Sequence, residues 1–248
     1  MSGSKHHSNH DVRNIKENTR RIPPSQNSFT RRCRPGFEAW QRRMSGERLR
    51  RFRQLATSER AQLYAAPGPD GKPVVLKVFL DDDEAAEHSM QREAAALLHL
   101  RNAAVGCVAA LLGEVSLHVS VPALALEYVP PARDEEKPGK PEVALTPEYL
   151  GEPALSECKE KVLAAFQATL GAGVVHGDVA HRNVLLTRGP GSALDVKIID
   201  WAMATVFDDV NSDAFREARR EELCAVSAML GWSEKHADTL HTAQSGGR

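Results

Sequence analysis

The stretch VVHGDVAHRNVLL, residues 174–186, sets a short polar segment between aliphatic residues. It supplies Asp178 and, further along, Asn183, and the apolar segment VKIID at 196–200 delivers Asp200 at its C-terminal end. Magnesium prefers carboxylate, amide, water and phosphate oxygens, so these three side chains suit a magnesium site. In phosphoryl transfer, an acid orients the attacking hydroxyl while an Asn and a second Asp hold metal ions against the nucleotide phosphates.

The whole chain favours a globular protein. Its 248 residues are 42% hydrophobic, which is enough to bury the core of one large domain or two small lobes. We find no apolar run near the roughly 18 residues that a membrane span needs, and the N-terminal MSGSKHHSNHDVR has no apolar segment for a signal peptide. We therefore expect a soluble, cytoplasmic or nuclear protein without a membrane partner. The four cysteines lack CxxC or CxxH spacing, which predicts reduced thiols.

Charge is distributed unevenly along the sequence. Residues 1–53 carry 14 Lys and Arg against 4 Asp and Glu, whereas residues 54–248 carry 18 against 29. Residues 1–30 are polar and rich in Asn and Ser, so we expect residues 1–35 to form a basic, largely disordered arm. Such an arm can contact an acidic partner or the acidic body of its own chain. Basic charge also permits nucleic-acid binding, which we do not expect here.

Residues 36–130 are predicted to form a β-rich part with a leading helix. Residues 36–53 have helical composition, and two extended segments, 61–66 and 74–80, flank the turn sequence PGPDGKP and predict a β-hairpin. A helix over 81–101 begins with acidic residues, and strands are expected around 114–119 and 123–129.

Residues 131–232 are predicted to form a second, mainly helical part. A Pro-rich, charged segment at 130–150 separates the two. Helices are expected over 156–173, ended by glycine, and over 216–232, with a strand at 196–200. Residues 233–248 read as a flexible tail. The expected fold class is α+β.

The ordered motifs resemble those of the protein kinase-like superfamily. HGDVAHRN matches the pattern His-x-Asp-x-x-x-x-Asn, IIDWA stands where Asp-Phe-Gly would be, and VVLKVF stands where Val-Ala-Ile-Lys would be. The resemblance covers roughly residues 52–232. It implies a two-lobed fold with a small β-rich N-lobe containing one helix, and a truncated, mainly helical C-lobe. The chain is similar to the small divergent kinase-like proteins of fungi.

This resemblance implies roles for the residues of the opening stretch. Asp178 resembles the catalytic base, and Asn183 and Asp200 resemble the magnesium ligands. Arg182 lies four residues after Asp178, as in tyrosine kinases. The implied cofactors are ATP and Mg²⁺. An acid on the last helix, Glu221 or Glu222, stands where one anchors the catalytic loop.

The resemblance also implies a nucleotide site in the β-rich part. Lys77 resembles the strand lysine that contacts the α- and β-phosphates, and Glu93 resembles its helix partner, with Glu87 as the alternative. The backbone of Glu127 to Val129 resembles the connection that meets adenine.

Two departures from the family pattern stand out. The segment QLATSERAQLY at 54–64 contains no glycine, so Thr57, Ser58 and backbone amides are the expected phosphate contacts. Gly177 replaces an arginine that pairs with a phosphorylated loop, and Trp201 follows the metal-binding Asp where Phe is usual.

Three hypotheses follow from these motifs. The first is an ATP- and magnesium-dependent kinase that phosphorylates a hydroxyl, most readily that of a protein. The missing glycines favour the second, a pseudokinase that serves as a binding module. The third, a small-molecule kinase similar to aminoglycoside phosphotransferases and choline kinases, rests on Gly177 and Trp201.

Overall fold

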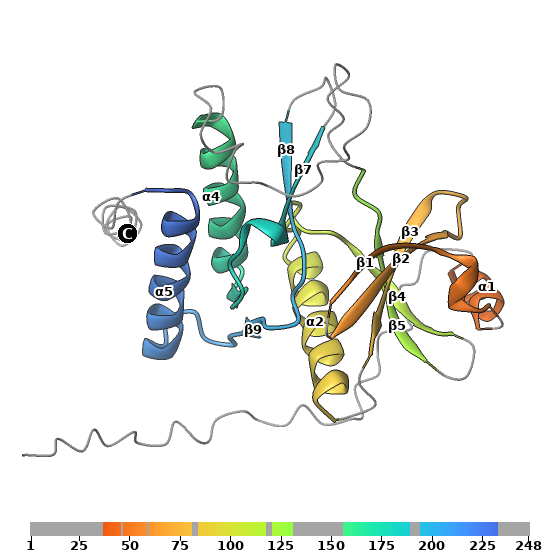
Figure 1. Ribbon diagram of the computed structural model, residues 1–248. Helices are drawn as coiled ribbons and strands as arrows, with labels where there is room; N and C mark the ends of the chain where they lie inside the picture. Colours follow the sequence, from red (N-terminus) through yellow and green to blue (C-terminus); the bar gives the residue numbers. More distant parts are fainter. Residues whose placement is uncertain are drawn as a thin grey trace, which may run out of the picture. The chain divides into compact units, whose positions relative to one another are not determined.

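The computed structural model describes residues 37–45, 47–58, 60–80, 84–117, 121–130, 156–188 and 194–232. The chain divides into two units, Met1–Arg32 and Cys33–Arg248, and every described residue belongs to the second. Within the described residues the fold is mixed α+β, with four α-helices, a five-stranded antiparallel sheet and two two-stranded sheets (Figure 1). The predictions for the basic arm, the Pro-rich segment and the tail lie outside the described residues. Among the described helices, none has the length and apolar content to cross a membrane.

The five-stranded sheet has the strand order β1-β2-β3-β5-β4. Its strands are β1 (Arg53–Thr57), β2 (Ala61–Pro67), β3 (Pro73–Phe79), β4 (Leu111–Ser116) and β5 (Pro122–Glu127), and all paired neighbours run antiparallel. The predicted hairpin is confirmed as β2 and β3, with Tyr64 opposite Leu76. Gly71 in their connection has φ +77°, a left-handed conformation that glycine adopts without strain.

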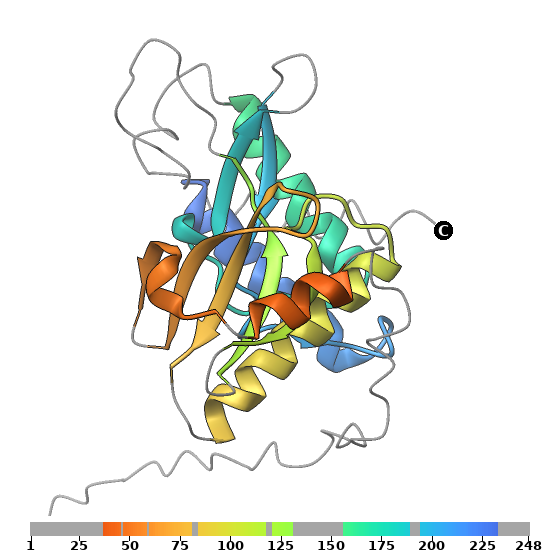
Figure 2. The same ribbon diagram turned by 90° about the vertical axis from the view of Figure 1, so that its right-hand side faces the viewer.

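Helix α1 (Phe37–Met44) packs on one face of this sheet (Figure 2). Its buried side chains join a core with alternate residues of β3: Phe37, Trp40, Met44, Val74, Leu76 and Val78. The indole Nε1 of Trp40 donates to the carbonyl of Pro67 at 2.7 Å. A Cβ on Gly113 would lie 2.5 Å from the Phe37 ring, so a side chain at this position would displace the helix.

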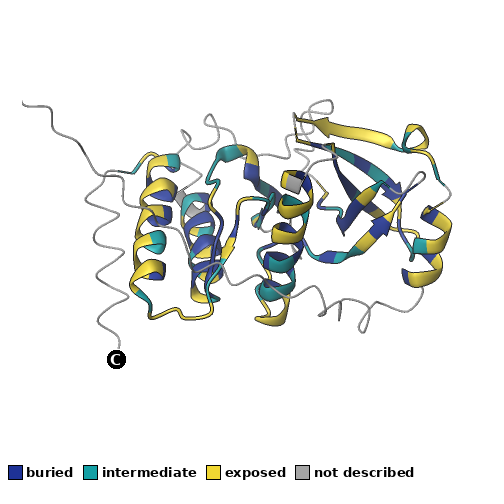
Figure 3. Cartoon of the chain, turned by 90° about the horizontal axis from the view of Figure 1, so that it is seen from below, coloured by how far each residue is buried: buried dark blue, intermediate teal, exposed yellow. Residues whose placement is uncertain are grey.

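The helix predicted over residues 36–53 is wrong in its second half. The helix ends at Met44, a short 3-10 turn η2 follows at Leu49–Arg51, and β1 begins at Arg53. Arginines form helices well, but pairing with β2 fixes the extended conformation of β1, and tertiary context overrides a weak local propensity. All five residues of β1 are exposed, so its sequence carries no alternation that would mark a strand (Figure 3).

Helix α2 (Glu84–Asn102) packs on the opposite face of the sheet. Successive strand residues point to opposite faces, so Lys77 points away from the α1 side, where Leu76 and Val78 lie. The helix buries Ala94, Leu97 and other apolar residues, and it contacts β3, β4 and β5. It confirms the helix predicted over 81–101, apart from residues 81–83, which lie outside the described residues.

The remaining described elements carry the polar stretch. They are α4 (Ser156–Gly171), β6 (Val174–Val175), η5 (His181–Asn183), β7 (Val184–Arg188), β8 (Leu194–Ile198), β9 (Thr205–Val206) and α5 (Asp213–Met229). Strands β6 and β9 pair with each other, and so do β7 and β8. The loop from β6 to β7 contains residues 176–183, so short strands at both ends hold it.

Element boundaries differ from the predicted ones by a few residues. The strand predicted at 196–200 runs from Leu194 to Ile198, which leaves Asp200 beyond its end. The helix predicted over 216–232 begins three residues earlier, because the hydroxyl of Ser212 caps it by accepting from the Phe215 N–H. A backbone bond from Ile198 N–H to the Cys107 carbonyl, 2.8 Å, joins β8 to the segment that follows α2.

Candidate functional site

Helix α5 holds the polar loop through one buried carboxylate. The two oxygens of Glu222 accept from the backbone N–H groups of His176 and Gly177, each at 2.8 Å. Burial raises the pKa of Glu222, while the two backbone bonds act in the opposite direction. The sequence left Glu221 and Glu222 open as anchors. Glu222 is the anchor, and Glu221 is exposed.

His176 connects the loop to the segment that carries Asp200. Its Nε2 donates to the Ile199 carbonyl at 2.9 Å, and its Nδ1 accepts from the Asp178 N–H at 3.2 Å, which together fit a neutral ring with its proton on Nε2. The ring packs edge-on against Trp201, with centroids 4.6 Å apart. Burial lowers the pKa of His176, so the ring stays neutral near pH 7.

Gly177 allows the loop to pass close to the residues after Asp200. Its φ is +76°, and a Cβ there would lie 2.6 Å from the carbonyl oxygen of Met203. Any other residue would meet both backbone strain and a steric clash. Glycine at position 177 therefore has a structural reason in this chain.

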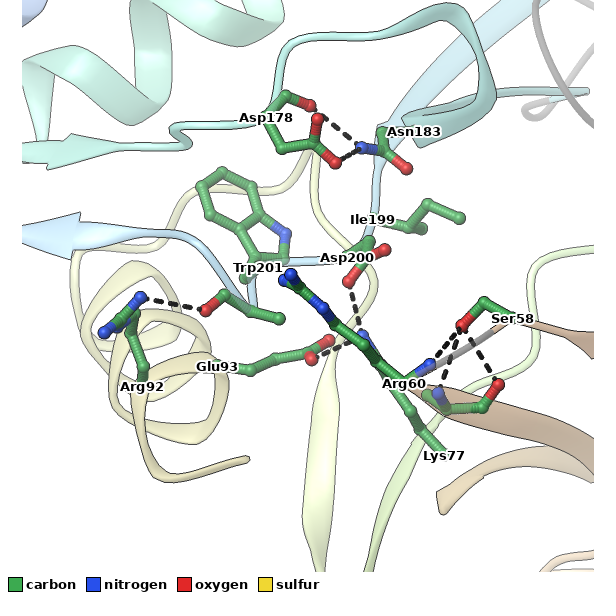
Figure 4. Close-up of polar contacts among 12 residues, drawn as sticks. Ser58, Arg60, Lys77, Arg92, Glu93, Asp178, Asn183, Ile199, Asp200 and Trp201 are labelled. Atoms are coloured by element: carbon green, nitrogen blue, oxygen red, sulfur yellow. Dashed lines mark hydrogen bonds and ion pairs between the residues drawn. The ribbon is translucent and has the colours of Figure 1, made fainter. Parts of the chain in front are cut away.

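Asp178 is oriented from two sides, by Arg182 and by Asn183, and Figure 4 shows the contact with Asn183. Arg182 Nη2 donates to both carboxylate oxygens at 2.9 Å, and Asn183 Nδ2 donates to the Asp178 carbonyl and to Oδ2, also at 2.9 Å. The Asp178 side chain retains 34% exposure, whereas Asn183 is buried. The carboxylate is thus fixed in orientation but remains partly accessible to solvent.

Lys77 brings residues from three distant segments together. Its ammonium group lies 2.6 Å from Glu93 Oε2 on α2 and 2.5 Å from Asp200 Oδ1 (Figure 4). The alternative partner, Glu87, is exposed and bonded to Gln91. Glu93 is therefore the helix residue that meets the strand lysine.

Burial and charge oppose each other in this triad. Burial alone would lower the pKa of Lys77, but the carboxylates of Glu93 and Asp200 outweigh it and raise that pKa. Burial raises the pKa of Glu93, which the ammonium group of Lys77 only partly offsets. Burial would also raise the pKa of Asp200, yet Lys77 holds it below its usual value. Lys77 and Asp200 are therefore both ionised at neutral pH.

Asp200 itself adopts an unusual backbone conformation. Its φ is +64°, in the left-handed region that non-glycine residues seldom occupy. Trp201 is fully buried beside it and donates from Nε1 to the Ile198 carbonyl at 3.3 Å. Such strain is held where the surrounding structure over-determines it, and it concentrates at functional sites.

The oxygen atoms at this site fit a magnesium ion. The Asn183 side chain donates two hydrogen bonds from Nδ2, so its Oδ1 is the atom that could bind a metal ion. The Asp200 side chain is 43% exposed. Magnesium keeps several waters and takes phosphate oxygens, so one or two protein oxygens suffice. Within the described ranges, no three His, Cys, Asp or Glu residues gather into a cluster that would make a dedicated all-protein metal site.

The turn between β1 and β2 differs from the predicted phosphate cradle. The Ser58 hydroxyl accepts from the N–H groups of Arg60 and Ala61, at 3.3 and 3.1 Å, and Ser58 N–H donates to the Ala61 carbonyl. In this conformation the N–H groups of Arg60 and Ala61 and the hydroxyl of Ser58 bond within the turn, and the neighbouring Thr57 is exposed.

The residues predicted to meet adenine lie at the end of β5. The Glu127 N–H donates to the Ala110 carbonyl at 2.8 Å, and its carboxylate accepts from the Ala110 N–H at 3.0 Å. Val129 is buried. Glu127 therefore fixes the segment after α2 against the end of the strand, a role that sequence reasoning missed.

Sequence reasoning also missed a second link between α2 and the segment after Asp200. Arg92 Nη1 donates to the Ala202 carbonyl at 3.4 Å. Arg92 precedes Glu93 in the chain, so two adjacent residues of α2 contact the Ala202 carbonyl and the Lys77 ammonium group. In the sequence, this link is indicated only by the position of Arg92 next to Glu93.

Comparison with protein-family models and with curated proteins finds no match for this chain. The functional interpretation therefore depends on the residues and their geometry.

Proposed function

We propose that the protein is a two-lobed, kinase-like phosphotransferase that moves the γ-phosphoryl group of ATP to a hydroxyl, in the presence of magnesium. The observation that carries this proposal is the triad of the buried Lys77 and Glu93 with the half-exposed Asp200, beside the oriented Asp178. A purely structural role would not require a buried lysine between two acids together with a third acid whose oriented carboxylate remains partly exposed. The N-lobe of the proposal is the five-stranded sheet with α2, and the C-lobe is the abbreviated helical part.

The residues would divide the work of positioning and charge neutralisation. Asp178 orients the acceptor hydroxyl and takes its proton, and Arg182 and Asn183 fix the direction of that carboxylate. Glu93 keeps Lys77 extended toward the phosphates. Asn183 and Asp200 would hold magnesium, which neutralises charge on the phosphate oxygens when bound. Little covalent chemistry is asked of the protein in such a transfer, so alignment supplies most of the acceleration.

The proposed acceptor is a hydroxyl on a protein. A small-molecule acceptor remains the alternative that Gly177 and Trp201 favour by resemblance. For Gly177, the close approach to Met203 supplies a structural reason that is independent of the acceptor. That reason weakens the argument for a small molecule.

A pseudokinase that serves as a binding module is the second candidate. The self-contained β1–β2 turn favours it, because backbone amides that already have partners do not cradle phosphates. The direct ion pair between Lys77 and Asp200 also favours it, because nucleotide and magnesium would have to compete with that pair.

Phosphate tracking tests the proposal. Full-length protein is incubated with γ-labelled ATP, magnesium and a cell extract, and macromolecules are then separated from metabolites. Asp178→Asn should abolish labelling, whereas Asp208→Asn, the same change at an exposed position, should label as the wild type does. Label on protein supports the proposal, and label among metabolites moves the acceptor to a small molecule. Equal labelling by the wild type and Asp178→Asn would rule out Asp178 as the catalytic base.

A further inference from the structure

The turn between β1 and β2 is closed by its own hydrogen bonds. The Arg60 N–H donates to Ser58 Oγ, and the Arg60 carbonyl accepts from the Leu80 N–H at 3.1 Å. Arg60 is therefore pinned at both backbone groups. A nucleotide phosphate in this region would find few free amides, so contact from this side has to come from a side chain.

Lys77, the cation already present in the site, is paired with two carboxylates. Lys77 is shared between Glu93 and Asp200, so its positive charge is balanced before any ligand arrives. A nucleoside triphosphate brings several negative charges into the same space, and buried charges require partners. A second cation facing the phosphates would therefore contribute strongly to affinity.

Arg60 has the position and the freedom to supply that cation. Its side chain extends from the turn across Lys77 toward Asp200 and Trp201 (Figure 4). Arg60 is exposed, and its guanidinium group makes no recorded bond to another described residue. The backbone of Arg60 is held in place while its guanidinium group is left available. This arrangement is expected of a side chain that binds an anionic ligand.

We propose that Arg60 binds the phosphate oxygens of the nucleotide and replaces, with a charged fork, the backbone amides of a glycine-rich loop. A guanidinium group presents parallel N–H donors that match two phosphate oxygens, whereas an ammonium group acts as a point charge. This inference rests on the proposed function, because it assigns a ligand contact within the same nucleotide site. It predicts that Arg60 contributes to ATP affinity through the phosphates, whereas other residues bind the nucleoside.

Nucleotide binding to the full chain tests the inference without a measurement of turnover. Binding of MgATP and of adenosine is measured by calorimetry for the wild type, Arg60→Gln, Arg60→Lys and Arg53→Gln. Arg53 is exposed at the other end of β1, so its replacement removes the same charge from the same strand region. Arg60→Gln should weaken MgATP binding about tenfold or more and leave adenosine binding unchanged, with a smaller loss for Arg60→Lys. Arg53→Gln should bind both ligands as the wild type does.

Two kinds of outcome would overturn the inference, and they are distinguishable. If the wild type binds MgATP and Arg60→Gln binds it equally well, or loses adenosine to the same extent, Arg60 is not a phosphate contact, and the proposed function stands. If the wild type binds neither MgATP nor adenosine, the nucleotide site itself is absent and the proposed function fails with it. The melting temperature of each ligand-free variant checks that the exposed substitution leaves the fold intact.

Discussion

The loop around Asp178 and the turn between β1 and β2 face the same triad, but they are held in opposite ways. The loop is tied to other elements, by Glu222 from α5 and by the bond from His176 to Ile199. The turn is tied mainly to itself, through the hydroxyl of Ser58. The loop that carries Asp178, the proposed catalytic base, is therefore fixed by buried contacts. The turn proposed to lie near the nucleotide depends instead on exposed side chains.

This difference has an energetic consequence. Buried backbone donors that lose a partner cost about 1–3 kcal/mol each, whereas exposed donors can turn to water. Substitutions beneath the loop should therefore cost stability, and substitutions in the turn should alter binding with little effect on folding. Four measurements test that contrast.

Replacement of Lys77 should have the largest effect, because this residue joins the two regions. Lys77→Met leaves Glu93 fully buried without a counter-charge, and such a loss costs about 3–5 kcal/mol. Burial already raises the pKa of Glu93, and removal of the ammonium group raises it further. The variant should be most stable below the ordinary Glu pKa and lose stability as the pH rises through the raised value. Urea unfolding at several pH values measures this dependence.

The double variant Lys77→Met/Glu93→Gln is the control for that experiment. It removes the buried charge together with its partner. The double variant should therefore regain part of the lost stability, and the pH dependence caused by Glu93 should largely disappear. A loss that stays constant with pH, or that persists in full in the double variant, would show that packing of the lysine chain rather than charge accounts for the effect.

Glu222 should rank second, since it acts on the loop alone. Glu222→Ala leaves the N–H groups of His176 and Gly177 without their acceptor, at a cost of about 2–4 kcal/mol. The neighbouring Glu221→Ala, at an exposed position, should change the unfolding free energy by less than about 0.5 kcal/mol. Equal effects of the two variants would contradict the assignment of Glu222 as the anchor.

Protonation of His176 should give a smaller effect, which appears only in acid. Its folded-state pKa is lowered by burial, although the charges of Asp200 and Asp178 act the other way. In mild acid His176 is therefore protonated in the unfolded chain but not in the folded chain. The free energy of unfolding falls as the pH drops below about 6.5 toward the lowered pKa of His176. His176→Gln should flatten this part of the stability profile, which unfolding measurements at several pH values would show. An unchanged slope in His176→Gln would assign the acid sensitivity to another group.

The sequence predicted features that depend on local pattern or on ordered motifs. The hairpin of β2 and β3 and the helix α2 follow from turn chemistry and composition. The pairing of Lys77 with an acid on α2 follows from the resemblance of the ordered motifs, which left Glu87 open beside Glu93. Strand β1 escaped prediction because all its residues are exposed and only pairing with β2 makes it a strand. The choice of Glu222 over Glu221 depends on which side of α5 is buried against the loop, and the engagement of Ser58 depends on turn geometry. Composition carries neither kind of information.

Ser58 should give the smallest effect and complete the comparison. Ser58→Ala removes the acceptor of two N–H groups, as Glu222→Ala does, and also a donor to the Ala61 carbonyl, but Ser58 is exposed and water can replace its hydroxyl. The expected loss of unfolding free energy is about 0.5–1 kcal/mol, measured by urea unfolding beside Glu222→Ala. A loss as large as that of Glu222→Ala would mean that the turn is held as firmly as the loop. A small loss would mean that burial, rather than the number of hydrogen bonds, determines how firmly a segment is held.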